Sequence, residues 1–276
     1  MIYVNIQGGL GNQLFQSAFG LLVEQRSGVP ARFLNHSYTN YSYGFKYELE
    51  AFPNLQNRAV PLTSIPPNAL HCRENLNELA SSNALDYIAG LAREHKDIVL
   101  DGYWSNEAYW GDNEGFVRAL VTPVPPNSEL SLLGEQIRDM NTIGIHVRRH
   151  EYGHHGVACM DYYRNALKEI RRIHGELPAL VFTDEFNVCQ FEFHGIPNLQ
   201  VVHGDPKEPL LDFYGLCSCK HFILSNSSFS YWGAFIAETP DSIVYMPYPF
   251  CTFLSTTVLH QRAQRWHIVE GAVRRA

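Results

Sequence analysis

The second half of the chain alternates short apolar strand patterns with helix patterns, and this regularity constrains the fold more than any other feature of the sequence. Such alternation is typical of a parallel sheet with helices on both faces. The sequence therefore predicts an α/β fold. The strand patterns cover residues 142–147, 179–182, 199–202, 221–224 and 243–246, and the helices between them are expected to begin with a cap at Asp161 and near residues 186, 209 and 229.

The first half begins in the same way but is harder to assign beyond residue 36. A Pro-rich run at 122–126 is the strongest candidate for a linker. We therefore predict two domains, residues 1–135 and 136–276. The N-terminal patterns are a strand at 2–6, a Gly-rich turn at 8–11, a helix from Asn12 that Gly28 can end, and strands at 31–34 and 98–100.

Composition excludes several classes of protein. The 276 residues hold 21 Lys and Arg against 28 Asp and Glu, a net charge of −7, which argues against binding nucleic acid through bulk charge. The 6 cysteines form no paired CxxC motif, which favours a reducing compartment. No long apolar run or secretory leader is recognisable. We expect a cytoplasmic protein without a membrane span, with room for peripheral association at the cytoplasmic membrane.

Polar residues follow four successive strand patterns, where open α/β sheets bind their ligands. Arg148 and Arg149 can supply planar forks for phosphate. Ser227 and Ser228 stand where a helix begins, so backbone N–H groups and the helix dipole can hold an anion. Asp212 lies in an apolar helix, where its carboxylate needs a partner such as the N1–H and 2-amino pair of guanine.

Each residue also has a purely structural interpretation. The arginines could pair with Glu151 or Asp161, the serines could be ordinary helix caps, and Asp212 could be a satisfied carboxylate of the core. Because all of them converge on one edge of the predicted sheet, we favour a site for a phosphorylated ligand.

Other site motifs are absent or weak. The sequence holds no GxGxxG, P-loop or Asp-x-Asp motif. The histidines at 150, 154 and 155 lack metal-ligand spacing and are better explained as a solvated loop. We therefore expect no metal site and no cofactor.

The blocks GGLGNQLFQ at 8–16, HVRR at 146–149, VFTDE at 181–185 and SNSSFSYWG at 225–233 together resemble the bacterial α-1,2-fucosyltransferases of glycosyltransferase family 11. Residues 47–49 and 102–105 match as well. The HxRR block is shared with other fucosyltransferases, whereas the first and last blocks are more specific to the α-1,2 group.

The resemblance implies a GT-B fold, with two Rossmann-like domains facing across a cleft. It implies a metal-independent, inverting galactoside α-1,2-fucosyltransferase that moves L-fucose from GDP-β-L-fucose to a galactose-terminated glycan of the cell surface. Transfer of another GDP-sugar, or to another hydroxyl, stays open as an alternative. A non-catalytic sugar- or nucleotide-binding protein is a further alternative, which the arginine pair and the serine block disfavour.

The resemblance also suggests roles for individual residues in the donor site. It places Arg148 at the β-phosphate with Arg149 nearby, and Asp184 at the edge of the donor pocket. His146 and Asp212 would lie near guanine, and Gly9 and Asn12 would belong to the opposite domain. Ser227, Ser228 and Phe229 would surround the diphosphate.

The loop after the arginines departs from the family pattern HxRRGDY, since His150 and Glu151 replace its Gly and Asp. Glu151 keeps an acidic group and is a candidate for the catalytic base. It could equally be an ion-pair partner that orients one of the arginines.

Overall fold

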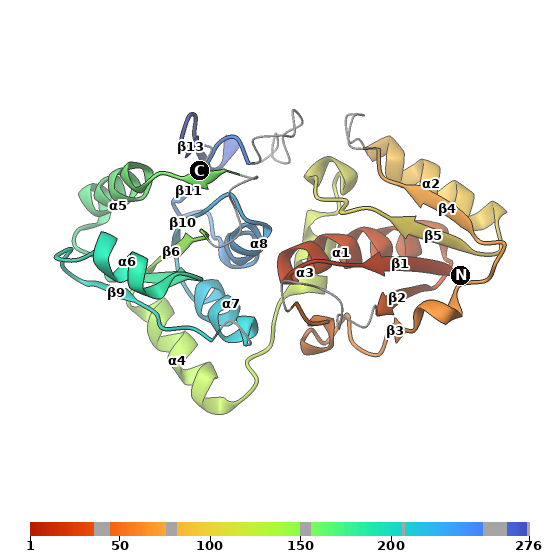
Figure 1. Cartoon of the computed structure of the whole chain (residues 1–276), viewed down its shortest axis with the longest axis horizontal. Coiled ribbons are helices and arrows are strands. Elements are labelled where there is room, and N and C mark those ends of the chain that lie inside the picture. The colour runs from red at the N-terminus through yellow and green to blue at the C-terminus, as the bar shows by residue number, and fades with distance from the viewer. Residues whose placement is uncertain (36–44, 76–81, 150–155, 206–207, 251–263, 275–276) are drawn as a thin grey trace. The chain divides into compact units, whose positions relative to one another are not determined.

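The chain forms two compact units in a computed structural model that describes residues 1–35, 45–75, 82–149, 156–205, 208–250 and 264–274. The first unit runs from Met1 to Val124 and the second begins at Pro125 (Figure 1). Residues 125–135, which the sequence-based division gives to the first domain, therefore lie in the second unit. Their helix α4 (Ser128–Asp139) contacts α7 (Pro209–Cys217) of that unit.

The described strands of the first unit form a parallel five-stranded sheet in the order β3-β2-β1-β5-β4. The chain therefore adds β2 and β3 on one side of β1 and then crosses over to place β4 and β5 on the other side. The strands are β1 (Ile2–Ile6), β2 (Ala31–Asn35), β3 (Ala59–Val60), β4 (Leu70–Arg73) and β5 (Ile98–Asp101), and the helices are α1 (Leu10–Ser27), α2 (Ser82–Glu94) and α3 (Glu114–Val121). Single 3-10 turns, η2 (Leu49–Ala51), η3 (Leu62–Ser64) and η4 (Glu107–Tyr109), complete this unit.

Two buried glutamines of α1 tie the loops of this unit together. The Gln13 side chain donates to the carbonyls of Gly8 and Lys46, at 3.0 and 2.6 Å, and accepts from the Glu48 amide at 2.9 Å. Gln13 and the second glutamine, Gln16, are both fully buried. The bonds of Gln13 therefore satisfy polar groups that would be costly to bury without partners. The GNQLFQ block thus has a structural role that its spacing alone did not reveal.

The described strands of the second unit form a parallel six-stranded sheet in the order β12-β11-β10-β6-β8-β9. Numbered along the chain, this is the 3-2-1-4-5-6 order of a Rossmann fold. The strands are β6 (Ile143–Val147), β8 (Ala179–Thr183), β9 (Leu199–Val201), β10 (His221–Ile223), β11 (Val244–Pro247) and β12 (His267–Val269), and the remaining helices are α5 (Met160–His174), α6 (Phe186–Glu192) and α8 (Ser228–Ala237). An antiparallel pair, β7 (Val157–Ala158) and β13 (Val273–Arg274), lies outside this sheet.

The core of the second unit divides between the two faces of β6. Ile143, Ile145 and Val147 pack with the apolar stripe of α5. On the other face, Gly144 leaves no room for a Cβ, because Leu216 and Cys219 around the end of α7 approach its backbone closely. The alternation of side chains along β6 therefore separates an apolar face from the face that carries His146.

The expected α/β architecture with Rossmann-like sheets is confirmed, with local corrections. Helix α5 begins after Cys159, so Asp161 lies in its first turn and is not the cap. Helix α1 begins two residues before Asn12, and it ends at Gly28 as expected, in the left-handed conformation. The short strands β3, β4 and β12 were not predicted. Within the described residues, no helix is long and apolar enough to span a membrane.

Helix α1 crosses β1 at a glycine, which gives a test of the core. A Cβ on Gly20 would overlap with the Val4 side chain, whereas a Cβ on Gly90, in α2, would meet nothing within 4 Å. We expect Gly20→Ala to lower the free energy of unfolding by about 1–3 kcal/mol through overpacking. Gly90→Ala should raise it by about 0.5–1 kcal/mol, since alanine is the better helix former. Urea unfolding of both variants checks this, and equal effects would contradict it.

Candidate functional site

The site lies at the carboxyl edge of the second sheet, between β6 and β10, where the strand order reverses. His146 is at the end of β6 and Ser225 follows β10, and the His146 Nδ1 and Ser225 Oγ atoms are 2.7 Å apart. Both side chains are buried. Ligands of open α/β sheets bind beyond such a switch point, so this hydrogen bond lies beneath the expected binding position.

His146 is held as a neutral ring. Burial, with the nearby Arg148 charge in addition, lowers the pKa of His146 to about 3. Its ring stacks on Phe229 of α8, with centroids 5.1 Å apart, and Phe213 meets Phe229 edge-on at 5.2 Å. Between Ser225 and Phe229, His146 serves as a rigid and uncharged part of the site.

Asp184, at the end of β8, organises the segment that carries the two arginines. Its Oδ2 atom lies 3.2 Å from Arg148 Nε, and its Oδ1 atom accepts from the Arg149 backbone amide at 3.0 Å. The Arg148 side chain stays partly exposed. One carboxylate therefore fixes both the direction of the Arg148 guanidinium and the course of the chain beside it.

Arg149 lies among different neighbours. Burial raises the pKa of Tyr163 in α5, and the nearby Arg149 guanidinium acts in the opposite direction. Burial likewise raises the pKa of Cys189, which Arg149 also opposes. Arg149 Nε and the Tyr163 hydroxyl are buried without a hydrogen-bond partner among the described residues. The structure thus brings Arg148 to Asp184 and Arg149 towards α5 and α6.

The serine block forms the start of α8, as predicted. Ser227 is the N-cap residue in an extended conformation and makes no side-chain capping bond, and Ser228 is the first helical residue. Ser230 Oγ donates to the Ser227 carbonyl at 3.1 Å, and Asn226 Nδ2 donates to the Gly156 carbonyl at 2.9 Å. These contacts fix the turn, while the first N–H groups of the helix point beyond the sheet edge.

Asp212 lies in the first turn of α7 and faces the backbone of Gly204, where a Cβ would overlap with its carboxyl group. Burial raises the pKa of Asp212 to about 6. The carboxyl makes no hydrogen bond or ion pair within the described part of the chain. It is therefore a half-buried acceptor with capacity for a ligand.

Three predicted site residues remain, and two of them lie in the other unit. Gly9 and Asn12 belong to the first unit, where Gly9 is the N-cap of α1 and the Asn12 side chain lies against Gly8. Glu151 lies outside the described residues. The donor-site roles of Gly9 and Asn12 and the catalytic role of Glu151 stay predictions.

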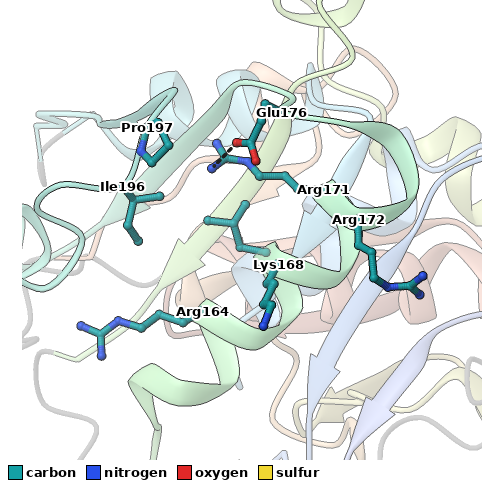
Figure 2. Close-up of a pocket in the computed structure, with 8 residues that line it drawn as sticks. Arg164, Lys168, Arg171, Arg172, Glu176, Ile196 and Pro197 are labelled. Atoms are coloured by element: carbon teal, nitrogen blue, oxygen red, sulfur yellow. Dashed lines mark ion pairs between the residues drawn. The ribbon is translucent and has the colours of Figure 1, made fainter.

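The described residues contain no cluster of three His, Cys, Asp or Glu side chains that could hold a metal. A hollow of about 370 Å³ lies along α5, and none of the predicted site residues lines it. Figure 2 shows Arg164, Lys168 and Arg172 around it, and Arg171 paired with Glu176. The Arg171 Nη1 and Glu176 Oε2 atoms are 3.3 Å apart. Because most of these cations have carboxylate partners, this surface is a solvated basic face.

The sequence model of Glycosyl transferase family 11 matches residues 83–251, which is more than half of the chain and includes the whole group around His146 and Asp184. The chain belongs to glycosyl transferase family 11. It is therefore a glycosyltransferase. The predicted family is confirmed.

Two curated relatives from Escherichia coli are similar over nearly their whole length. An α-1,2-colitosyltransferase is 25% identical, covering 91% of this chain and 92% of the relative. The O-antigen biosynthesis glycosyltransferase WbnK is 26% identical, covering 89% and 93%.

Solved structures support the fold. The NodZ α-1,6-fucosyltransferase soaked with GDP-fucose aligns with a TM-score of 0.54 at 15% identity, covering 88% of this chain and 94% of NodZ. The E. coli ADP-heptose LPS heptosyltransferase II aligns with a TM-score of 0.51 at 11% identity, covering 97% and 89%. Both are GT-B enzymes, and the GT-B fold of this chain is thereby confirmed.

The buried histidines predict an acid-sensitive fold. Burial lowers the pKa of His146 to about 3 and of His221 to about 4, so the unfolded chain binds more protons below pH 6.5. The free energy of unfolding should fall as pH drops from about 6.5 towards 4, by up to about 1.4 kcal/mol per pH unit for each histidine. Urea unfolding at pH 7, 6 and 5 measures this slope.

His146→Asn is the matched variant, since its amide can still bond Ser225 but does not titrate. We expect a shallower slope than in the wild type. Asp212, with its raised pKa, acts in the opposite direction but is common to both proteins. Identical slopes would show that His146 is not held neutral by the fold.

Proposed function

We propose that this glycosyltransferase moves L-fucose from GDP-β-L-fucose to the 2-hydroxyl of a terminal galactoside, with inversion and without a metal ion. The acceptor hydroxyl attacks C1 of fucose as the C1–O bond to the β-phosphate breaks, and the hydroxyl proton passes to a base or to solvent. Negative charge then develops on GDP. The main catalytic demand is to stabilise that charge.

The observation that carries this proposal is that Arg148 and the start of α8 follow the neighbouring strands β6 and β10 at one edge of the sheet. Asp184 holds one edge of the guanidinium through Nε, and Arg148 stays partly exposed for a ligand. The start of α8, with its backbone N–H groups and helix dipole, favours an anion at the same edge. Together they suit a diphosphate leaving group. Arg149, which is turned towards Tyr163, would then act by positioning Asp184 through its backbone amide.

The nucleobase pocket would lie by Asp212. Its half-buried carboxyl can accept the N1–H and 2-amino pair of guanine, and the neutral His146 and the Phe229 ring supply a flat apolar wall. A carboxylate acceptor matches guanine better than adenine, whose corresponding edge carries a ring acceptor in place of N1–H.

A second donor has specific support. One of the relatives is an α-1,2-colitosyltransferase. Chemically, colitose is L-fucose without its 3-hydroxyl. GDP-colitose is therefore the strongest competitor to GDP-fucose, with the same linkage and the same leaving group. GDP release from both donors, with and without a galactoside and with EDTA, separates the two. We expect release from GDP-fucose, stimulated by the galactoside and unaffected by EDTA. A clear preference for GDP-colitose would overturn the donor assignment.

Arg148→Ala tests the leaving-group role. Loss of this guanidinium should lower kcat by about 10²- to 10³-fold, because the charge on the β-phosphate would lose its main partner. Steady-state GDP release measures the effect. Arg172→Ala, which removes an exposed arginine of α5, is the matched control and should leave kcat unchanged. Similar turnover in both variants would contradict the assignment.

Glu151→Gln tests the base. If Glu151 takes the acceptor proton, the variant should lose the acidic limb of the kcat pH profile while the donor KM stays unchanged. A raised donor KM with the limb intact would instead indicate that Glu151 orients an arginine.

A further inference from the structure

The first unit has a switch point of its own, between β1 and β5. The chain leaves β1 at Gln7 and β5 at Gly102, and Gln16 of α1 joins these two exits. Its Oε1 atom accepts from the Gln7 amide at 2.9 Å, and its Nε2 atom donates to the Gly102 carbonyl at 3.3 Å. Gln16 is fully buried, so the two turns are held side by side from below. This is the position where an α/β unit binds a ligand.

The turn after β5 rests on a half-buried carboxylate that the predicted chemistry does not use. Glu74 follows β4, and its Oε2 atom accepts from the Tyr103 and Trp104 amides at 2.8 Å each. Its Oε1 atom accepts from the Tyr109 hydroxyl at 3.1 Å. Burial raises the pKa of Glu74, and these three donors oppose that shift. A half-buried carboxylate that accepts from three donors serves to fix the shape of the turn.

The turn contains a strained and buried residue, Trp104, next to an exposed tyrosine, Tyr103. Trp104 has a φ of 53°, which is unfavourable for a bulky residue, and its ring is fixed by stacking on Phe19 with centroids 4.3 Å apart. Its buried Nε1–H has no hydrogen-bond partner among the described residues. The neighbouring Tyr103 is 41% exposed. Strain held by buried contacts beneath a displayed aromatic side chain is typical of a binding site.

We propose that the turn Gly102–Trp104 binds the acceptor sugar, with the Tyr103 ring stacked on the apolar face of a pyranose and Glu74 as the positioning residue. The identity of the sugar, a galactoside, rests on the proposed function, whereas the position of the binding site does not. An aromatic face suits a pyranose because the C–H groups of the sugar are desolvated while its hydroxyls stay in water. Gly102 lets the turn pack closely on its support, since a Cβ there would overlap with Glu74.

Kinetics of the full chain test the stacking role. At saturating donor, Tyr103→Leu should raise the acceptor KM about three- to tenfold, whereas Tyr103→Phe, which keeps the ring, should stay within about twofold. The donor KM should not change in either variant. Tyr87→Leu removes a tyrosine of α2 that is 68% exposed and is the matched control, with both KM values unchanged.

Glu74→Ala and Glu74→Gln test the positioning role. The alanine variant leaves the Tyr103 and Trp104 amides without an acceptor, so the acceptor KM should rise while the donor KM stays unchanged. The glutamine variant keeps an amide oxygen for these donors and should restore much of the affinity. A general loss of stability would instead change both KM values or neither.

Direct binding separates this inference from the donor assignment. Saturation-transfer NMR of methyl β-galactoside with the wild type and GDP present should show contact that Tyr103→Leu weakens and Tyr87→Leu does not. If GDP-fucose proves to be the wrong donor, the kinetic comparison is repeated with the donor that the wild type uses, and the same pattern is expected. An acceptor KM in Tyr103→Leu equal to that of the wild type would overturn the inference.

Discussion

Parallel pairing of the strands is the constraint on which the rest of the structure depends. Within each main sheet the described strands all run parallel, so their carboxyl ends lie at one edge of that sheet. The reversal of strand order then leaves one position per unit where two loops diverge. At each of these positions buried side chains connect the two diverging segments by hydrogen bonds. In one unit His146 bonds to Ser225, and in the other Gln16 bonds to the backbone of both loops. Residues distant in sequence become neighbours because of this topology.

Local geometry reconciles an acidic protein with an anionic ligand. The net charge of −7 is spread over the chain, whereas the candidate donor edge combines Arg148, a helix start and a neutral histidine. Asp184 pairs with the Arg148 guanidinium through Nε, and the arginine side chain stays partly exposed. The carboxylate thus orients the positive group that the proposed function assigns to the diphosphate.

The sequence predicts what depends on pattern and misses what depends on partners. The strand and helix patterns of the second half, and the helix start at Ser227 and Ser228, could be predicted because apolar periodicity and caps are local signals. Strand β3 could not, since its two residues are fixed by pairing with β2. The different directions of the Arg148 and Arg149 side chains could not be predicted either, because they depend on the neighbours Asp184 and Tyr163. Glu74 belongs to no motif, and only its hydrogen bonds to the turn after β5 identify it.

The half-buried carboxyl of Asp212 couples ligand binding to proton release. Its pKa of about 6 means that a large share of the molecules carry this proton in mildly acidic solution. A ligand that donates two hydrogen bonds to Asp212 requires the ionised form, so its association must expel the proton. Affinity for such a ligand therefore rises as pH increases through 6, and the apparent binding enthalpy depends on the ionisation heat of the buffer. A single glycine, Gly204, makes this coupling possible by letting the backbone cover the carboxyl from one side.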